Sequence, residues 1–151
     1  MARMRSLMAI VVATCAVFAL VSAGPAAASP ESYMLRKVNH YRKAHGVRPV
    51  HLSRSLKRSA RKYAHYMMRR QYFGHAKRIH ASKRFRRLGE ILEWQTGYKP
   101  GVRRAFRTWL GSSSHRAIIL DGSFTYAGAG RARGRFKGRK STLWVMHFGR
   151  K

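Results

Sequence analysis

The stretch Trp109–Gly130, WLGSSSHRAIILDGSFTYAGAG, predicts the end of a helix, a second short helix and a strand in close succession. Apolar residues at positions 102, 105, 106 and 109 recur with the i, i+3, i+4, i+7 spacing of an amphipathic helix. The serine run Ser112–Ser114 is typical of a helix N-cap, and Asp121-Gly122 indicates a turn. The strand that begins at Phe124 therefore returns beneath the second helix.

His115 lies in the first turn of this second helix. With the predicted strand beneath it, the helix would hold an imidazole against a bound group. A surface histidine, or one that helps to cap the helix, fits the same pattern. The helical periodicity by itself leaves both interpretations open.

The N-terminal segment has the three parts of a secretory signal peptide. Two arginines in residues 1–5 precede the apolar run Leu7–Val21, and the small residues Ala26–Ala28 follow it. We predict that residues 1–28 are a signal peptide and that residues 29–151 form a single domain. An uncleaved membrane anchor is the alternative, although the run is shorter than the roughly 20 residues that a membrane span needs.

The charge balance is strongly basic, with 33 Lys and Arg against four Asp and Glu and a formal net charge of +29. Such a field attracts polyanions at long range, and added salt weakens the attraction. For an exported protein, the candidate partners are anionic envelope polymers, lipid head groups and extracellular nucleic acid bound without sequence specificity. Because the basic residues are spread along the chain, a solvated basic coat with no dedicated partner is the alternative.

The rest of the chain has the patterns of further helices and strands. In the predicted helix that follows Ser53, Ala60 and Ala64 are small and would let a neighbouring element approach closely, while Lys and Arg fill the opposite face. The patterns predict helices at 31–45 and from the Ser53 N-cap to about residue 72, strands at 89–94, 124–133 and 141–148, and a basic hairpin loop at 134–140.

Two further residues are candidates for chemistry, His75 just past a predicted helix end and Glu90 on a predicted strand. His75 follows an aromatic residue and a glycine, so it can point inward or into solvent. Glu93 is the nearest other acid, and its spacing from Glu90 places the two carboxyls on opposite faces of the strand. A carboxylate among so many cations fits an ion pair. A carboxylate beside neutral imidazoles fits a divalent-metal or acid–base site.

The order and spacing of several short motifs resemble the bacterial, secreted branch of the CAP superfamily. That superfamily groups the cysteine-rich secretory proteins, insect venom antigens and plant pathogenesis-related proteins, and its domain is also called the SCP domain. The resemblance extends from about Met34 to Phe148. It rests on Val38-Asn39-x-x-Arg42, Gly46-Val47, Leu56-xxx-Ala60-xxx-Ala64-xx-Met67, Phe73-Gly74-His75, Gly89-Glu90, Trp109-xx-Ser112-xx-His115-Arg116 and Gly128-Ala129-Gly130.

The resemblance implies an α+β fold, a three-layer α-β-α sandwich with a small antiparallel sheet between helical layers. It also implies a cleft where His75, Glu90 and His115 converge and hold zinc or another divalent cation. The animal and plant branches have a second Glu where this chain has Ser112, and Ile91 replaces an Asn of the family. The ligand set is therefore a triad, and two histidines with one glutamate are a known zinc set that leaves one position open.

These features favour a secreted, monomeric binding module over an enzyme, acting at the cell envelope or outside the cell and retained on the wall by charge. We expect no membrane-spanning segment after signal removal. The alternative is a hydrolase that uses metal or His/Glu acid–base chemistry at the triad on an anionic polymer. Direct killing by a cationic protein is a third hypothesis.

Overall fold

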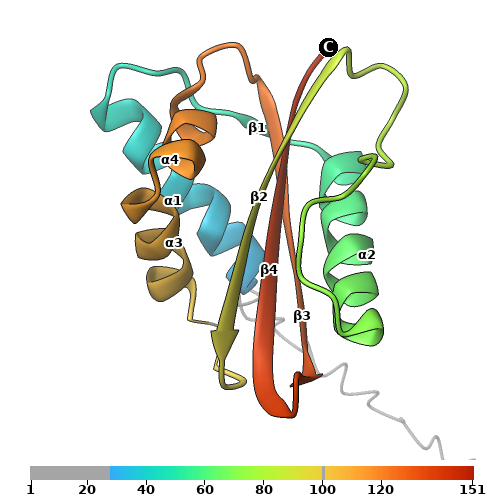
Figure 1. Cartoon of the computed structure of the whole chain (residues 1–151). Helices are drawn as coiled ribbons and strands as arrows, with labels where there is room; N and C mark the ends of the chain where they lie inside the picture. The colour runs from blue at the N-terminus through green and yellow to red at the C-terminus, as the bar shows by residue number, and fades with distance from the viewer. Residues whose placement is uncertain (1–27, 100) are drawn as a thin grey trace, which may run out of the picture.

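The computed structural model describes residues 28–99 and 101–151. The predicted signal peptide, apart from Ala28, and the predicted first-turn position of Pro100 lie outside these residues. Within them, four helices and four strands follow one another along the chain (Figure 1). Their bounds are α1 Pro30–Ala44, β1 His51–Leu52, α2 Arg54–Arg70, β2 Arg87–Thr96, α3 Val102–Gly111, α4 Ser113–Leu120, β3 Tyr126–Phe136 and β4 Arg139–Arg150.

The four strands form one sheet in the order β1-β3-β4-β2. Strand β4 pairs antiparallel with both β2 and β3, and the two-residue strand β1 pairs parallel with β3. Helix α2 covers one face of the sheet, and α1, α3 and α4 cover the other (Figure 1). The α+β, three-layer prediction is confirmed, with the difference that the short parallel strand makes the sheet mixed. None of the helices in the described part of the chain has the length and apolar character that crossing a bilayer requires.

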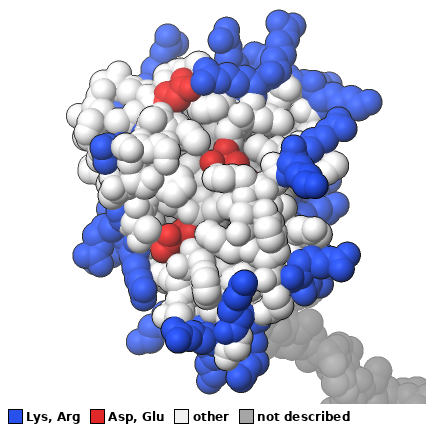
Figure 2. All heavy atoms as spheres, in the orientation of Figure 1, with Lys and Arg blue, Asp and Glu red and all other residues white. Residues whose placement is uncertain are grey.

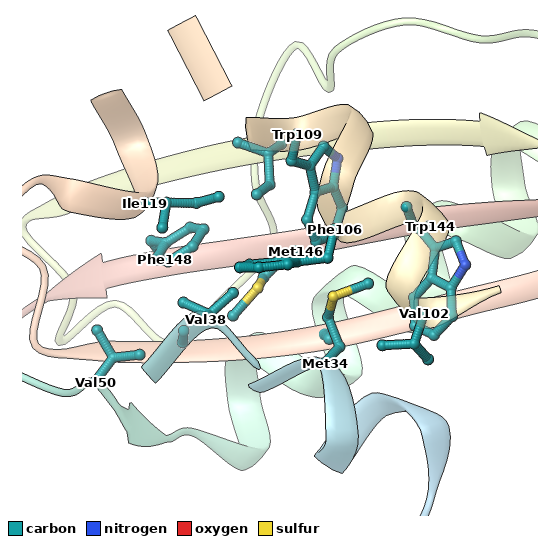
Figure 3. Close-up of a cluster of buried hydrophobic side chains, with 14 of the residues drawn as sticks. Met34, Val38, Val50, Val102, Phe106, Trp109, Ile119, Trp144, Met146 and Phe148 are labelled. Atoms are coloured by element: carbon teal, nitrogen blue, oxygen red, sulfur yellow. The ribbon is translucent and has the colours of Figure 1, made fainter. Parts of the chain in front are cut away.

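The larger hydrophobic core lies between the sheet and helices α1, α3 and α4 (Figure 3). Trp109, predicted on the buried stripe of its helix, is fully buried there, and its indole Nε1–H donates to the Leu92 carbonyl at 2.9 Å. This hydrogen bond satisfies a buried indole donor. The same core contains Met34, Val38, Val102, Phe106, Ile119, Trp144, Met146 and Phe148.

Helix α2 lies unusually close to strand β3, because β3 presents glycines to it. A Cβ on Gly128 would lie 2.6 Å from Lys57 Cα, and one on Gly130 would lie 2.6 Å from the Ala60 carbonyl carbon. Ala60 and Ala64 are fully buried on the facing side of the helix. The prediction that these alanines permit a close approach is confirmed, and the glycines of β3 are the other half of the contact.

A buried arginine joins helix α1 to the chain between α4 and β3. Arg42 is fully buried and donates four hydrogen bonds, all to main-chain carbonyls. These acceptors are Arg48 O at 2.8 Å, Ile119 O at 2.6 Å, Asp121 O at 3.1 Å and Phe124 O at 3.0 Å. A buried guanidinium is costly unless its donors are satisfied, and here Arg48 in the loop after α1 supplies one carbonyl and the end of α4 with the turn before β3 supplies three.

The predicted basic loop at 134–140 is wrong in extent, because β3 continues to Phe136 and β4 begins at Arg139. Only Lys137 and Gly138 form the turn, and both have positive φ, at 49° and 76°. A two-residue turn with positive φ at both positions matches the twist of a hairpin. The usual Asn-Gly or Asp-Gly signal is missing at this turn, so the sequence pattern gave no indication of it.

We expect Gly130→Ala to lower the free energy of unfolding by about 1–3 kcal/mol, because the methyl group would push helix α2 off the sheet. Gly111→Ala is the matched control. Its Cβ would meet nothing within 4 Å, so we expect a change of about 0.5 kcal/mol or less, or a small gain. Denaturant unfolding of both variants measures the difference. Equal stability of the two variants would contradict the close approach of α2 to β3.

Candidate functional site

Glu90 on strand β2 is the centre of the site. It is buried, and three donors reach its carboxylate. Oε1 accepts from His75 Nδ1 and from the Ala76 main-chain N–H, both at 2.9 Å, and Oε2 accepts from His147 Nε2 at 2.8 Å. A buried carboxylate with both oxygens hydrogen-bonded is held in one orientation.

The sheet register places His147 beside Glu90. His147 on β4 is the direct cross-strand partner of Glu90 on β2 and of Gly128 on β3. The three residues therefore form a row across the sheet on the face that α2 covers. His147 is 1% exposed, and its Nδ1 is buried without a hydrogen-bond partner among the described residues.

Sequence reasoning missed His147 as a site residue. It was visible only as a polar residue on a strand whose two faces are otherwise largely apolar. Such a residue needs a polar partner when it is buried. Glu90 is that partner, and the pairing depends on the β2–β4 register, which no local pattern specifies.

The hydrogen bonds on Glu90 keep it ionised. Burial alone raises the pKa of this carboxyl, but the hydrogen bonds from His147, Ala76 and His75 lower it, and its pKa lies below its usual value. A carboxylate only accepts hydrogen bonds. The ring nitrogen that faces it therefore carries the hydrogen, Nδ1 in His75 and Nε2 in His147.

The chain just past helix α2 positions His75. Gln71 ends the helix in the left-handed conformation, with φ of 51°. The Tyr63 hydroxyl on α2 then donates to the Gly74 carbonyl at 2.6 Å and fixes the residue before His75. Burial raises the pKa of Tyr63 to about 12, with a smaller contribution from the Glu90 charge. His75 itself remains exposed on its outer side.

His115 lies near His75 but is not hydrogen-bonded to Glu90. It is half-buried on α4, and its Nδ1 has no hydrogen-bond partner in the part of the chain that the structure describes. Burial lowers the pKa of His115, and the charge of nearby His75 lowers it further. Ser112 occupies the predicted N-cap position, but its hydroxyl lies 3.0 Å from the Ser114 hydroxyl and does not cap the helix.

In this arrangement, the three predicted metal ligands do not each have an atom free to bind a metal. Both oxygens of Glu90 are already hydrogen-bonded, and His75 directs its Nδ1–H at one of them. No group of three or more His, Cys, Asp or Glu among the described residues is arranged to hold a metal ion. To bind a metal, Glu90 would have to use oxygens that already accept these hydrogen bonds.

Glu93 lies on the opposite face of β2 from Glu90, as the spacing predicts. It is buried, and its neighbours are Thr108 and Arg104 of helix α3. Burial raises the pKa of Glu93 to about 7, although the Thr108 hydrogen bond and the Arg104 charge act in the opposite direction. Glu93 therefore takes no part in the site around Glu90.

A cavity of about 750 Å³ lies beside Glu90, between helix α2 and the segment 72–80. We call it the α2 pocket. Its apolar wall is mainly aromatic, and three cations, Lys62, Lys77 and Arg78, lie around it. The other residues that matter for its chemistry are Ser59, Tyr63, Tyr66, Tyr72, His75 and His147.

The surface charge is unevenly distributed on the face that Figure 2 shows. Lys and Arg gather around its edges and along the side of helix α2, and the middle of the face is mainly uncharged with a few acidic side chains. Helix α2 has no acidic residue, and six of its Lys and Arg are exposed: Arg54, Arg58, Arg61, Lys62, Arg69 and Arg70.

The chain matches the model of the family described as the cysteine-rich secretory protein family, CAP, over residues 35–148. No curated protein is similar enough in sequence to count as a relative.

Solved structures share the fold at low identity. An extracellular protein containing an SCP domain from Bacillus anthracis has a TM-score of 0.65 and 21% identity, over 81% of this chain and 40% of that one. An outer surface protein from Borrelia burgdorferi has a TM-score of 0.63 and 18% identity, over 79% and 90%. A cysteine-rich secretory protein from Staphylococcus aureus has a TM-score of 0.54 and 12% identity, over 81% and 38%. The chain thus spans less than half of the Bacillus and Staphylococcus proteins.

Zinc binding at His75, Glu90 and His115 stays a prediction of the family resemblance, and calorimetric titration beside a His75→Ala/His115→Ala variant tests it. Because the hydrogen bonds on Glu90 compete with a metal, we expect weak binding. Near-stoichiometric, tight binding that the double variant loses would show instead that the triad converges on the ion.

We expect Glu93→Gln to stabilise the protein at pH 8 by about 1–3 kcal/mol and to change little at pH 4. The native carboxyl has a pKa of about 7 against 4.5 in the unfolded chain, so native stability falls as the pH rises from 4.5 to 7.

Glu31→Gln is the control with the opposite sign. The Arg131 partner at 2.7 Å and other hydrogen bonds outweigh burial and lower the pKa of Glu31, so this variant loses stability at pH 8. Urea unfolding at both pH values measures the effects. A destabilising effect of Glu93→Gln at pH 8 would contradict the raised pKa.

Proposed function

Because the chain belongs to the cysteine-rich secretory protein (CAP) family, we propose that it is a secreted binding module for anionic polymers of the cell envelope. The site around Glu90 would then hold part of the ligand, and the basic surface would attract the polymer. We propose that the protein acts as a monomer and is retained on the wall by charge.

Secretion is supported by two observations. Residues 1–28 have the pattern of a signal peptide. The Bacillus anthracis protein that shares the fold is described as extracellular, and the Borrelia burgdorferi protein as an outer surface protein.

The observation that carries the proposal is the unpaired positive charge of helix α2. Its six exposed Lys and Arg have no acidic neighbour on the helix. The four acids of the chain are engaged or buried elsewhere: Glu31 pairs with Arg131, Asp121 with Arg87, Glu90 with two histidines, and Glu93 is buried behind β2. The positive field is therefore available to a polyanion.

The Glu90 site supports binding better than hydrolysis. For Glu90 to act as a general base, its carboxylate would have to take a proton from water or substrate. Both oxygens of Glu90 accept hydrogen bonds from His75, Ala76 and His147. A metal-dependent or His/Glu acid–base hydrolase acting on an anionic polymer stays the alternative, and it needs this arrangement to open.

We expect charge reversal on helix α2, Arg58→Glu/Arg61→Glu/Arg69→Glu, to weaken binding to purified wall teichoic acid at least about ten-fold at low salt. The control reverses three cations on the other side of the sheet, Lys43→Glu/Arg103→Glu/Arg107→Glu, and gives the same net charge. Co-sedimentation between about 50 and 500 mM NaCl measures both variants and the salt dependence.

Two outcomes would contradict the proposal. Equal losses in both variants would mean that only the net charge matters and that α2 is not a binding face. Wild-type binding that is insensitive to salt and to both reversals would mean that the charge has no role. Vesicles of anionic lipid and single-stranded DNA, tested alongside, show whether the surface prefers the polymer.

A further inference from the structure

The α2 pocket has an inner wall made of hydrogen-bond acceptors. The Glu90 carboxylate takes the Nε2–H of His147 and the Nδ1–H of His75, and in the neutral form of each imidazole the other ring nitrogen has a lone pair and no hydrogen. The Tyr63 hydroxyl has already given its hydrogen to the Gly74 carbonyl. All three residues line the pocket, and with both imidazoles neutral their remaining polar atoms are acceptors.

One of these acceptors is unsatisfied in the protein itself. His147 Nδ1 is buried and has no hydrogen-bond partner among the described residues. A buried polar atom without a partner costs free energy. Because the atom is buried, a ligand hydroxyl or N–H group reaches it only when the side chains around it shift, and a ligand that does so would gain from donating to it.

The outer wall of the pocket offers aromatic faces. Tyr66 and Tyr72 are 43% and 48% exposed although they are large and partly apolar. Tyr63 and Tyr66 on helix α2 are stacked, with ring centroids 5.8 Å apart and an angle of 15° between the rings, and so form a rigid platform. Such a surface takes the flat, apolar face of a ring.

Cations surround this wall. Lys62, Lys77 and Arg78 line the pocket, and all three are exposed. They favour a ligand that has a negative group beside its ring. A fatty acid would supply the negative group, but its hydrocarbon tail has no donor for the acceptors of the inner wall.

We propose that the α2 pocket binds one unit of a hydroxyl-rich, anionic saccharide. The hydroxyls of the sugar donate to His147, His75 and Tyr63, and its apolar face lies against Tyr66 or Tyr72. Its acidic group lies at Lys62, Lys77 or Arg78. The acidic group is a carboxylate, as in a sugar acid, or a phosphate, as in a sugar phosphate. This inference rests on the proposed function, because it assigns the polymer chemistry that the same site would recognise.

Calorimetry with two probes, tri-galacturonate and glucose 6-phosphate, tests the site and distinguishes the carboxylate from the phosphate. We expect saturable 1:1 binding of at least one probe. Tyr66→Ala and Tyr72→Ala should each weaken it about ten-fold, since each removes a ring face. Tyr98→Ala is the matched control, because Tyr98 is similarly exposed at 41% but does not line the pocket, and it should change affinity less than about two-fold.

A second pair of variants tests whether binding needs the cations that line the pocket. Lys77→Gln should weaken binding of the anionic probe, whereas Lys43→Gln, which removes one cation from helix α1, should leave it unchanged. Maltotriose, a neutral saccharide, should bind more weakly than tri-galacturonate.

Several results would overturn the proposal. Failure of both probes to bind at millimolar concentration would overturn it, and equal effects of Tyr66→Ala and Tyr98→Ala would exclude the pocket as the site. Binding of dodecanoate or oligo-dT that depends on Tyr66, without binding of either saccharide, would assign the pocket to a lipid or a nucleic acid.

The outcome can be separated from that of the proposed function. The charge reversals at Arg58, Arg61 and Arg69 leave the residues that line the pocket intact. If they abolish teichoic acid binding while the tyrosine variants have no effect on the saccharide probes, the basic surface stands and the pocket proposal fails. If the tyrosine variants lose the probes while the reversals leave polymer binding intact, the pocket stands and the role of the basic surface fails.

Discussion

The contact on which the rest of the molecule depends is the close approach of helix α2 to strand β3. Gly128 and Gly130 leave no side chain between the two backbones, and Ala60 keeps the facing side of the helix small. Because Gly128 is also the cross-strand neighbour of His147, the contact that seats the helix also covers the imidazole. Because the helix packs in this way, its tyrosines lie beside Glu90. The packing of α2 therefore stabilises the sheet and also positions the tyrosines that line the α2 pocket.

The few acidic residues of the chain lie in different surroundings, and their pKa values differ accordingly. Glu90 is ionised because three donors reach it, whereas Glu93, three residues along the same strand, faces α3 and has a pKa near neutrality. The difference comes from the partners on each face of the sheet. Two histidines orient Glu90, and in return the carboxylate fixes which nitrogen of each ring has the hydrogen. A single buried charge thus sets which nitrogen of each imidazole in the inner wall faces the carboxylate as a donor.

The helices and strands followed from local patterns, and the parts of the site that required long-range pairing did not. The spacing of Trp109 with its apolar neighbours and the Ser53 N-cap placed two helices within a few residues of their bounds. His75 and Glu90 were identified as site residues and are hydrogen-bonded. His147 was missed because its partner is 57 residues away, and only the sheet register joins them. The hairpin between the last two strands was predicted, but with too long a loop, because the positive φ values of Lys137 and Gly138 are adopted by residues without the usual turn signature.

Arg42 holds helix α1 through main-chain carbonyls and needs no carboxylate. Salt that screens charges at the surface reaches such a buried, fully hydrogen-bonded group poorly. The same salt relieves repulsion among the many exposed Lys and Arg and weakens their attraction for a polyanion. Brine would therefore detach the protein from a charged matrix without unfolding it, and the detached molecule could attach again when the salt is diluted. The adhesion proposed above would then be reversible in a medium whose salinity changes, and the fold would stay intact through each cycle.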